Sequence, residues 1–164
     1  MGNNHSTLAK ELGDKLKAKG LTIATAESCT AGAIGAAIAS VNGASAYFVG
    51  GVIVYATRLK TEILGVDADC IANHGVVSRE TAVAMNEGVR KVTQSDLAIS
   101  ITGYAGATGG DEFAENGTIW ICACMNGHEP STRCLKVDGA RDTNLQLAVD
   151  EALKLTLEYI ENEG

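Results

Sequence analysis

A short apolar run, a turn and a helix of small residues form the stretch that most restricts the fold of this chain. Residues 22–40 read TIATAESCTAGAIGAAIAS, in which the apolar run ends at Glu27-Ser28-Cys29-Thr30 and the rest is almost wholly Ala, Gly and Ile. This order predicts a strand followed by a helix, with Ser28 as the N-cap residue. Because small side chains let a helix lie close to a sheet, the stretch indicates an α/β fold.

The rest of the chain alternates between patterns typical of helices and of strands. Leu8, Leu12 and Leu16 recur at helical spacing, and Gly20 is placed to end that helix. The other expected elements are strands over 21–26, 45–56 and 96–103, a short helix ending at Gly65, a helix capped by Ser78, a hairpin around Asn126-Gly127, and a helix over 141–161.

Together these elements predict a three-layer α/β/α fold, with a mixed β-sheet between two layers of helices. Gly50-Gly51 inside the second strand indicates a bulge or a close backbone approach. The helix after Ser78 is expected to turn four apolar side chains inward: Ala82, Met85, Val89 and Val92. No linker divides the chain, so we expect residues 1–164 to form one domain, with 1–6 as a disordered leader.

Charge and hydropathy exclude several classes of function. The formal net charge is −7 and the 13 Lys and Arg residues are scattered, whereas a nucleic-acid-binding protein would present a basic face. No apolar run reaches the ~18 residues of a membrane span, and no segment resembles a signal peptide. The start MGNNHS fits the loose myristoylation pattern, but no polybasic second anchor follows it. We therefore expect a cytoplasmic protein without nucleic-acid or membrane partners.

The five cysteines are odd in number and unevenly spaced, which argues against a disulfide framework. Cys122 and Cys124 lie two apart on a predicted strand and so share one of its faces. A two-residue turn at Asn126-Gly127 would place Cys134 opposite Ile119, facing the other way. We therefore expect small buried thiols and no metal site.

Ser28 has two interpretations. Serine is a favoured N-cap residue, so its role could be purely structural. It could instead be a nucleophile, because the unpaired amides of Cys29 or Thr30 at a helix start would stabilise an oxyanion. Cys29 is a rival nucleophile, although its side chain would turn along the helix and away from the cap position.

A serine nucleophile needs a base, and the histidines are poor candidates for it. None of the three has an evident orienting carboxylate, which disfavours a Ser-His-Asp triad: His5, His74 and His128. Lys60 follows the second strand, five residues after Tyr55. It could act as a base only if burial or a neighbouring cation such as Arg58 lowered its pKa. The alternative is an ordinary solvated lysine on a helix.

The sequence GYAGATGG at 103–110 is a glycine-rich loop after a strand. It lacks the Gly-Lys-Ser/Thr of a P-loop, and no clear helix follows it as in a dinucleotide fingerprint. Such a loop can still present backbone amides to a phosphate or carboxylate, but it can equally be a plain turn. Arg141, at the start of the last helix, is either a phosphate clamp or a solvated arginine.

Taken in order, four segments resemble one known family: Glu27-Ser28-Cys29-Thr30, Tyr55 with Lys60, Gly103 to Gly110, and Gly139-Ala140-Arg141-Asp142. From about residue 8 to 160 the chain resembles the CinA C-terminal domain, standing alone as in the nicotinamide mononucleotide amidohydrolases. The resemblance implies that domain's fold and hydrolysis of the carboxamide of nicotinamide mononucleotide to nicotinate mononucleotide and ammonia. It implies no metal and no cofactor.

The resemblance also implies roles for matching residues. Ser28 would be the nucleophile, Lys60 its base and Tyr55 a proton-relaying partner, with the amides of Cys29 and Thr30 as oxyanion donors. The expected substrate-binding residues belong to the glycine loop, its preceding strand and the last helix: Thr102, Gly103, Gly106, Gly109, Gly110 and Arg141.

Five positions depart from the family pattern and cluster in loops expected to line the pocket: Ala31, Thr57, Tyr104, Ala107 and Asn116. They leave two classes of function open. One is a serine amidohydrolase acting on a nicotinamide nucleotide or a related amide, and the other is a nucleotide-binding or regulatory module without turnover. The oligomeric state is likewise open between a monomer and a homodimer.

Overall fold

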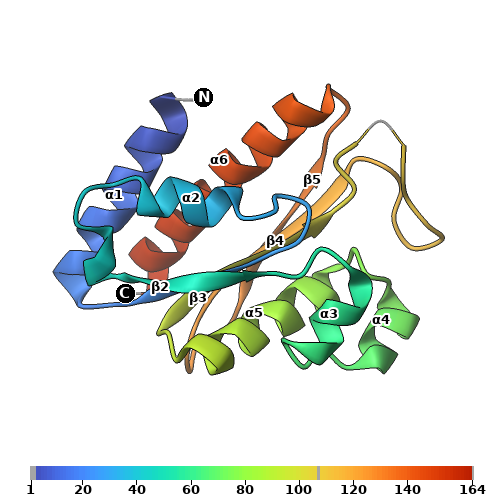
Figure 1. The fold of residues 1–164 in the computed structure, drawn as a ribbon, viewed down its shortest axis with the longest axis horizontal. Helices are drawn as coiled ribbons and strands as arrows, with labels where there is room; N and C mark the ends of the chain where they lie inside the picture. The colour runs from blue at the N-terminus through green and yellow to red at the C-terminus, as the bar shows by residue number, and fades with distance from the viewer. Residues whose placement is uncertain (1–2, 107, 164) are drawn as a thin grey trace.

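The computed structural model describes residues 3–106 and 108–163 and has a mixed five-stranded sheet between two layers of helices (Figure 1). The fold is therefore the predicted three-layer α/β/α arrangement. Its elements are α1 (Asn3–Lys19), β1 (Ile23–Glu27), α2 (Ala33–Ala39), the 3-10 turn η1 (Ala44–Ala46), β2 (Phe48–Ile53), α3 (Thr57–Glu62), α4 (Ala68–His74), α5 (Arg79–Thr93), β3 (Leu97–Gly103), β4 (Thr118–Met125), β5 (Ser131–Lys136) and α6 (Arg141–Glu163).

The strand order is β2-β1-β3-β4-β5, so β3, predicted as a central strand, lies in the middle of the sheet. β2, β1 and β3 are parallel, whereas β3, β4 and β5 are antiparallel. The carboxyl ends of the three parallel strands meet at one edge of the sheet. The chain leaves β1 towards β2 and leaves β3 towards β4, so the loops after these neighbouring strands diverge and open a crevice between them.

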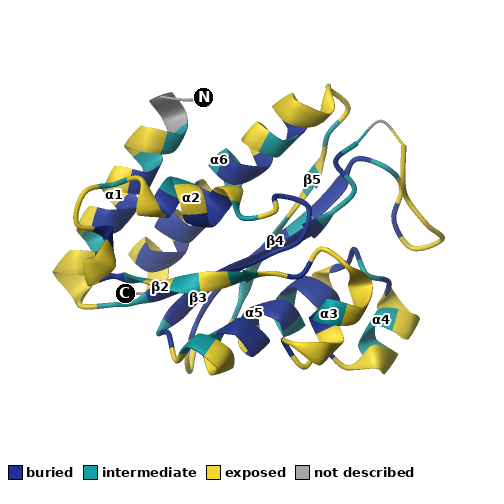
Figure 2. Cartoon of the chain, in the orientation of Figure 1, coloured by how far each residue is buried: buried dark blue, intermediate teal, exposed yellow. Residues whose placement is uncertain are grey.

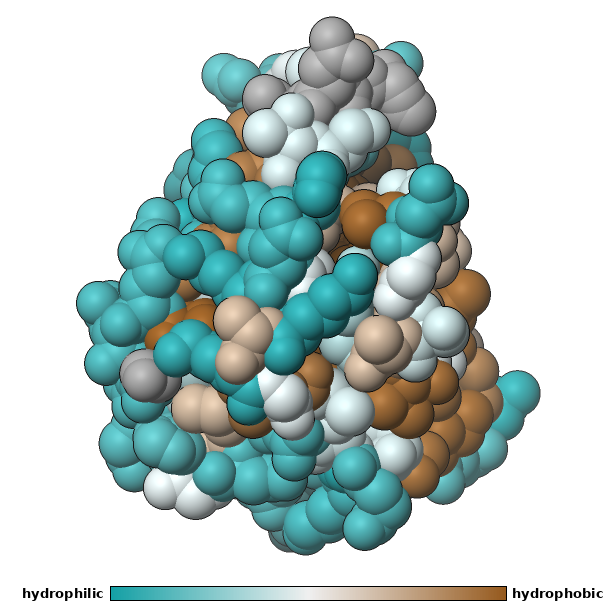
Figure 3. Space-filling view, turned by 90° about the vertical axis from the view of Figure 1, so that its left-hand side faces the viewer, coloured by the Kyte–Doolittle hydropathy of each residue, from teal (hydrophilic) through white to brown (hydrophobic). Residues whose placement is uncertain are grey.

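Two cores hold the layers together, because each face of the sheet buries apolar side chains against its own helices (Figure 2). α1, α2 and α6 cover one face over a core that includes Leu12, Leu16 and Ile99. α5 covers the other face, where Met85 and Val89 pack on the sheet. Hydrophilic residues predominate on the side view in Figure 3, as expected when helices turn their apolar sides inward. Within the described residues, no helix is both long and apolar enough to cross a membrane.

Two local expectations were wrong, and one helix was not predicted. α1 begins at Asn3, so residues 3–6 of the expected leader are helical, while residues 1–2 lie outside the described residues. Val92, expected to face inward, is 54% exposed, since the helix buries Thr81, Asn86 and Gly88 instead. α4 was not predicted, because the seven residues of Ala68–His74 are too few to show a helical period and none of them is buried.

The hairpin between β4 and β5 forms as predicted, but its register differs by one residue. Cys134 lies opposite Trp120, so it shares a face with Cys122 and Cys124 instead of facing the other way. Only Gly127 of the turn has a positive φ, +81°, whereas type I′, the usual two-residue turn for Asn-Gly, needs a positive φ at both positions. Cys122 and Cys124 are buried with Ala82, as expected of small buried thiols.

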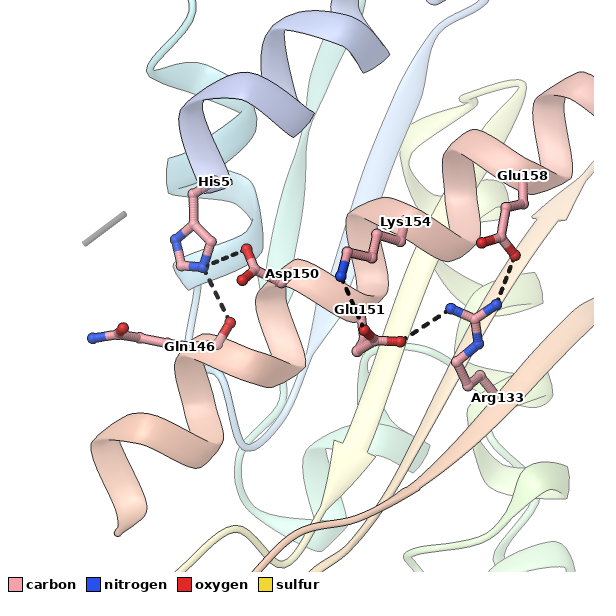
Figure 4. A network of polar contacts seen from close by, with 7 residues as sticks. All are labelled: His5, Arg133, Gln146, Asp150, Glu151, Lys154 and Glu158. Carbon is pink, nitrogen blue, oxygen red and sulfur yellow. Dashed lines mark hydrogen bonds and ion pairs between the residues drawn. The ribbon is translucent and has the colours of Figure 1, made fainter. Parts of the chain in front are cut away.

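Polar contacts also tie α6 to its neighbours (Figure 4). His5 of α1 lies 3.1 Å from the Gln146 carbonyl oxygen and 3.0 Å from Asp150, both on α6. Arg133 of β5 lies between Glu151 and Glu158 of α6, 3.1 Å and 2.6 Å from their carboxylate oxygens. These contacts fix the helix whose first turn reaches the site described below.

Two glycines permit close backbone approaches. In β2, the pairing with β1 shifts beside Ile23, and a Cβ atom on Gly51 would lie 2.8 Å from the Thr25 carbonyl oxygen. The glycine pair therefore marks both a bulge and a close approach. In α5, a Cβ atom on Gly88 would lie 2.9 Å from the Leu64 carbonyl carbon, in the segment that follows α3. Gly88 thus lets α3 and its loop pack tightly onto α5.

We predict that Gly88→Ala lowers the free energy of unfolding by about 1–3 kcal/mol, because the added methyl group overpacks a backbone contact. Helix propensity alone would change stability in the opposite direction, by ~1 kcal/mol. Urea unfolding measures the difference in the free energy of unfolding. The control is Glu87→Ala, at the exposed neighbouring position, whose free energy of unfolding should stay within about 0.5 kcal/mol of wild type. An alanine variant as stable as wild type would contradict the tight contact.

Candidate active site

A pocket of about 320 Å³ lies at the carboxyl ends of β1 and β3, in the crevice expected at this point of the sheet. The segment after each of the three parallel strands, the segment before α5 and the start of α6 all contribute to it. Its lining is Ser28, Cys29, Tyr55, Thr57, Lys60, Val76, Val77, Thr102, Gly103, Tyr104, Ala105, Gly106, Thr108 and Arg141.

Ser28 is not the N-cap of the helix, contrary to the sequence prediction. α2 begins at Ala33, after a turn in which Ala31 and Gly32 both have positive φ, 49° and 99°. The Glu27 carboxylate takes the capping role instead. Its oxygens accept hydrogen bonds from the amides of Ile34 at 2.9 Å and Gly35 at 2.8 Å. A carboxylate suits this place because the first amides of a helix are unpaired and carry partial positive charge.

The turn after β1 is held in place from both sides. Glu27 also accepts a bond from the Thr30 hydroxyl at 2.7 Å, and the Ser28 amide donates to the Ile101 carbonyl at 3.2 Å. Ala31 has a left-handed φ that favours glycine, so this turn carries backbone strain. Within residues 3–106 and 108–163, the amides of Cys29 and Thr30 donate to no backbone carbonyl. Among the described residues, the turn therefore presents a hydroxyl beside two amides that have no backbone acceptor.

Lys60 of α3 is buried, 1% exposed, directly beneath Ser28. Its Nζ atom lies 3.0 Å from Ser28 Oγ and donates to the Val54 carbonyl at 2.7 Å. Burial lowers the Lys60 pKa from an ordinary 10.5 to about 8. Arg58 is not the cause, because its side chain is 70% exposed and pairs with Glu62 at 2.8 Å. The lysine is therefore not the solvated helix residue of the alternative interpretation.

Cys29 lines the same pocket but has the opposite electrostatic character. Its side chain is buried, and burial raises the pKa of the thiol from 9.0 to about 11. Because the thiolate is the nucleophilic form of cysteine, a thiol with such a pKa is unreactive near neutral pH. Of the two neighbouring candidates, Ser28 has the basic partner.

Tyr55 and Arg141 meet at the mouth of the pocket, although they lie far apart in sequence. Arg141 Nη2 donates to the Tyr55 hydroxyl at 3.0 Å. The tyrosine is 57% exposed, and its hydroxyl bonds to Arg141 rather than to Ser28 or Lys60. Arg141 is the first residue of α6, so the helix start directs a cation towards the pocket.

The glycine loop lines the pocket from Gly103 to Gly106 and at Thr108, but not at its last two glycines. Thr102, Gly103 and Gly106 line the pocket as expected, whereas Gly109 and Gly110 do not. Gly110 forms a bridge with Glu115, and Gly109 packs beside the Tyr104 ring, whose hydroxyl donates to Asp111 at 2.9 Å. These contacts hold Gly109 and Gly110 within the loop's own fold and away from the pocket. Of the family departures, Thr57 and Tyr104 line the pocket, Ala31 and Asn116 do not, and Ala107 lies outside the described residues.

Sequence reasoning missed Val76 and Val77, which line the pocket from the segment before α5. The Thr102 hydroxyl donates to the Val76 carbonyl at 2.9 Å and so joins this segment to β3. It also missed the role of Glu27. A charged residue that continues the apolar run of β1 was the available signal, because such a residue must be buried with partners. Within the described residues, no three His, Cys, Asp or Glu side chains gather where they could hold a metal ion.

These features define an α/β protein with a buried serine–lysine pair in a pocket at the ends of its parallel strands. The chain belongs to the CinA C-terminal domain family, whose sequence description matches residues 5–160. It is similar to solved structures of that superfamily. One of them, the competence damage-inducible protein A of Klebsiella pneumoniae, is 31% identical, with a TM-score of 0.94, over 99% of this chain and 100% of that one.

Relatives of two lengths share this domain. The nicotinamide-nucleotide amidohydrolase PncC of Escherichia coli is 36% identical over 94% of both chains. A competence-damage inducible relative from Desulforudis audaxviator is 40% identical over 94% of this chain, but the chain spans only 37% of that protein. The chain thus matches nearly the whole of the shorter relative and a little over a third of the longer one.

We predict that Lys60→Met stabilises the protein at neutral pH. Lys60 releases its proton near pH 8 when folded but near 10.5 when unfolded, so the unfolded state binds more protons between these values and stability rises with pH there. Below about pH 8 the full cost of burying the charge is present, on the order of 3 kcal/mol before the two lost hydrogen bonds are counted.

Urea unfolding of both proteins from pH 6 to 10.5 measures this effect as a difference, which removes the contribution of other groups. The methionine variant should be more stable at pH 7, and the gap should close as the pH rises above about 8. A constant difference in stability between the two proteins across this pH range would show that the charge on Lys60 does not destabilise the folded state.

Proposed function

We propose that this protein is an amidohydrolase that removes the carboxamide nitrogen of nicotinamide mononucleotide as ammonia, with Ser28 as nucleophile and Lys60 as base. The observation that carries the proposal is the contact between Lys60 Nζ and Ser28 Oγ, 3.0 Å long and buried. The 36% identity to the E. coli nicotinamide-nucleotide amidohydrolase, over 94% of both chains, supports the reaction class.

The geometry around Lys60 suits a base that takes a proton from a hydroxyl. A neutral amine has two hydrogens and one lone pair, and the Val54 carbonyl accepts one hydrogen at 2.7 Å. The lone pair can then accept the Ser28 proton as Oγ attacks the carboxamide carbon. With a pKa of about 8, a useful fraction of Lys60 is neutral near physiological pH.

The remaining steps balance with the same two side chains and Tyr55. The carbonyl oxygen becomes an oxyanion, for which the amides of Cys29 and Thr30, free of backbone acceptors among the described residues, are the nearest donors along the chain. As the tetrahedral intermediate collapses, the proton held by Lys60 passes to the leaving nitrogen, with the Tyr55 hydroxyl as a relay that gives one proton and receives another, so ammonia departs and an ester remains on Ser28. Water, deprotonated by Lys60, hydrolyses the ester to the carboxylate and restores the serine.

Tyr55 is proposed to relay a proton at the pocket mouth. Its hydroxyl oxygen accepts a bond from Arg141 at 3.0 Å, which leaves its own hydrogen free to donate. A hydroxyl that accepts from a cation is a better donor in turn, and this suits protonation of a departing nitrogen. The hydroxyl is not bonded to Ser28 or Lys60, so the relay would run through substrate or water.

Three features support a nucleotide as substrate. The pocket, at about 320 Å³, falls at the lower end of the range of small-ligand sites. Arg141 and the backbone of Gly103 and Gly106 offer a cation and close backbone approach for a phosphate. The net charge of −7 also suits a substrate with a cationic pyridinium ring, and that ring withdraws electrons from the carboxamide under attack.

The test of this function is ammonia release from a panel of nicotinamide nucleotides and simple amides. We expect faster release from nicotinamide mononucleotide than from free nicotinamide, because remote phosphate binding orients the amide over Ser28. Equal rates would refute the phosphate site. No release from any amide would assign the protein to the class of binding or regulatory modules. The departures from the family pattern at Thr57 and Tyr104, which line the pocket, would then account for the loss of turnover.

Two neighbouring substitutions separate the candidate nucleophiles. Ser28→Ala should lower kcat by at least about 10³-fold, because it removes the attacking atom. Cys29→Ala is the matched control and should stay within about threefold of wild type, since it keeps the backbone amide that serves as oxyanion donor. An acyl adduct on Ser28 should appear in intact-protein mass spectrometry after rapid acid quench. Loss of activity in the Cys29 variant alone would reverse the assignment.

Activity should rise with pH because Lys60 works as the neutral amine. We expect kcat/KM to increase about tenfold per pH unit below the pKa of about 8 and to level off above it. Lys60→Arg keeps the charge but cannot serve as base, so kcat should fall by about 10²–10⁴-fold while the fold is retained. An active arginine variant with the same pH profile would assign the base to Tyr55 or to water.

A further inference from the structure

Asn144, one turn into α6, is buried, 4% exposed, and its side chain joins two segments of the pocket wall. Its Nδ2 atom donates to the Ala105 carbonyl at 3.1 Å and to the Gly139 carbonyl at 2.9 Å. Its Oδ1 atom accepts from the Gly139 amide at 3.0 Å. Both amide hydrogens and one acceptor site are therefore used, on two different loops.

The two loops carry the groups that would bind an anion. Ala105 directly precedes Gly106 in the glycine loop, and Gly139 lies two residues before Arg141. The guanidinium lies against the loop backbone, because a Cβ atom on Gly106 would be 2.7 Å from Arg141 Nη1. Apart from its bond to the exposed Tyr55 hydroxyl, no other hydrogen bond holds the Arg141 side chain among the described residues. The position of Arg141 relative to Gly106 is therefore set mainly by the backbone on each side.

We infer that Asn144 is a positioning residue that holds the glycine loop and the start of α6 at the separation needed to bind a phosphate between Gly106 and Arg141. The inference rests on the proposed function. Asn144 does not line the pocket, so it acts only through these two segments. It thereby makes the protein select substrates that carry a phosphate over the same substrates without one.

A helix-capping role alone would not explain the bond to Ala105. The contacts with Gly139 lie within five residues of Asn144 and order the first turn of α6, as a local side-chain bond to the backbone does. The contact with Ala105 spans 39 residues and joins the helix start to a different loop. Asparagine satisfies both because an amide offers two donors and an acceptor in one plane.

The test compares one substrate with and without its phosphate. The assay measures ammonia release from nicotinamide mononucleotide and from nicotinamide riboside. It compares wild type with Asn144→Leu and with a control, Gln146→Leu, at an exposed position on the same helix. We expect Asn144→Leu to raise KM for the mononucleotide about tenfold or more, with kcat/KM for the riboside within about twofold of wild type, since the lost bonds act on the phosphate site. Gln146→Leu should change neither.

The combination with Arg141→Ala separates positioning from general destabilisation. If Asn144 acts through Arg141, the preference for the mononucleotide should fall little further when Asn144→Leu is added to Arg141→Ala. Equal losses on both substrates, or additive losses in the double variant, would overturn the inference and leave the proposed reaction intact.

Binding separates this inference from the proposed function altogether. Titration calorimetry with inorganic phosphate should show weaker binding to Asn144→Leu than to wild type, whether or not the protein turns over an amide. Phosphate binding of equal strength in both proteins would refute the role of Asn144. Absence of ammonia release from every substrate, with the difference in phosphate binding preserved, would refute only the reaction.

Discussion

The buried Glu27 carboxylate is the interaction on which the rest of the site depends. An anion without a cationic partner is costly to bury unless hydrogen bonds satisfy it, and here the Thr30 hydroxyl and two amides of α2 do so. Because Glu27 supplies the cap, the helix starts at Ala33 and the intervening residues form a turn. That turn raises Ser28 out of the helix and into the pocket. The small residues of α2 let its amides approach the carboxylate.

A second buried charge depends on packing at a distance from the pocket. Lys60 can be covered only if α3 and the segment after it lie close to α5, and Gly88 permits that approach at Leu64. Among the residues that the structure describes, the lysine then has two polar partners, Ser28 and the Val54 carbonyl, and no carboxylate. The same burial that lowers its pKa costs stability. The site thus gains a neutral amine near pH 8 through the fit between helices on one face of the sheet.

Hydrophobic periodicity and the residues that begin and end elements predicted most of the architecture from sequence. Three examples lie where expected: Leu12 and Leu16 on the core side of α1, Ser78 as the cap of α5, and the central strand β3. Details that depend on long-range contacts were wrong. The Glu27 side chain from the preceding strand replaced Ser28 as the cap, and the only local signal for it was a charged residue at the end of an apolar run. The hairpin register followed from backbone angles at Gly127. The separation of Gly106 from Gly110 arose because the loop pairs with Glu115.

The bulge in β2 has a consequence for how copies of this protein meet one another. β2 is an edge strand with no charged residue and no proline, and Val49 and Ile53 on it are 48% and 51% exposed. An uncharged, apolar edge strand is a template for pairing with another strand, and repeated pairing leads to aggregates. The extra residue between Phe48 and Gly50 breaks the regular spacing of donors and acceptors along that edge. This edge therefore lacks charge but has an irregular register, which is one of the features that make an edge strand a poorer template for pairing.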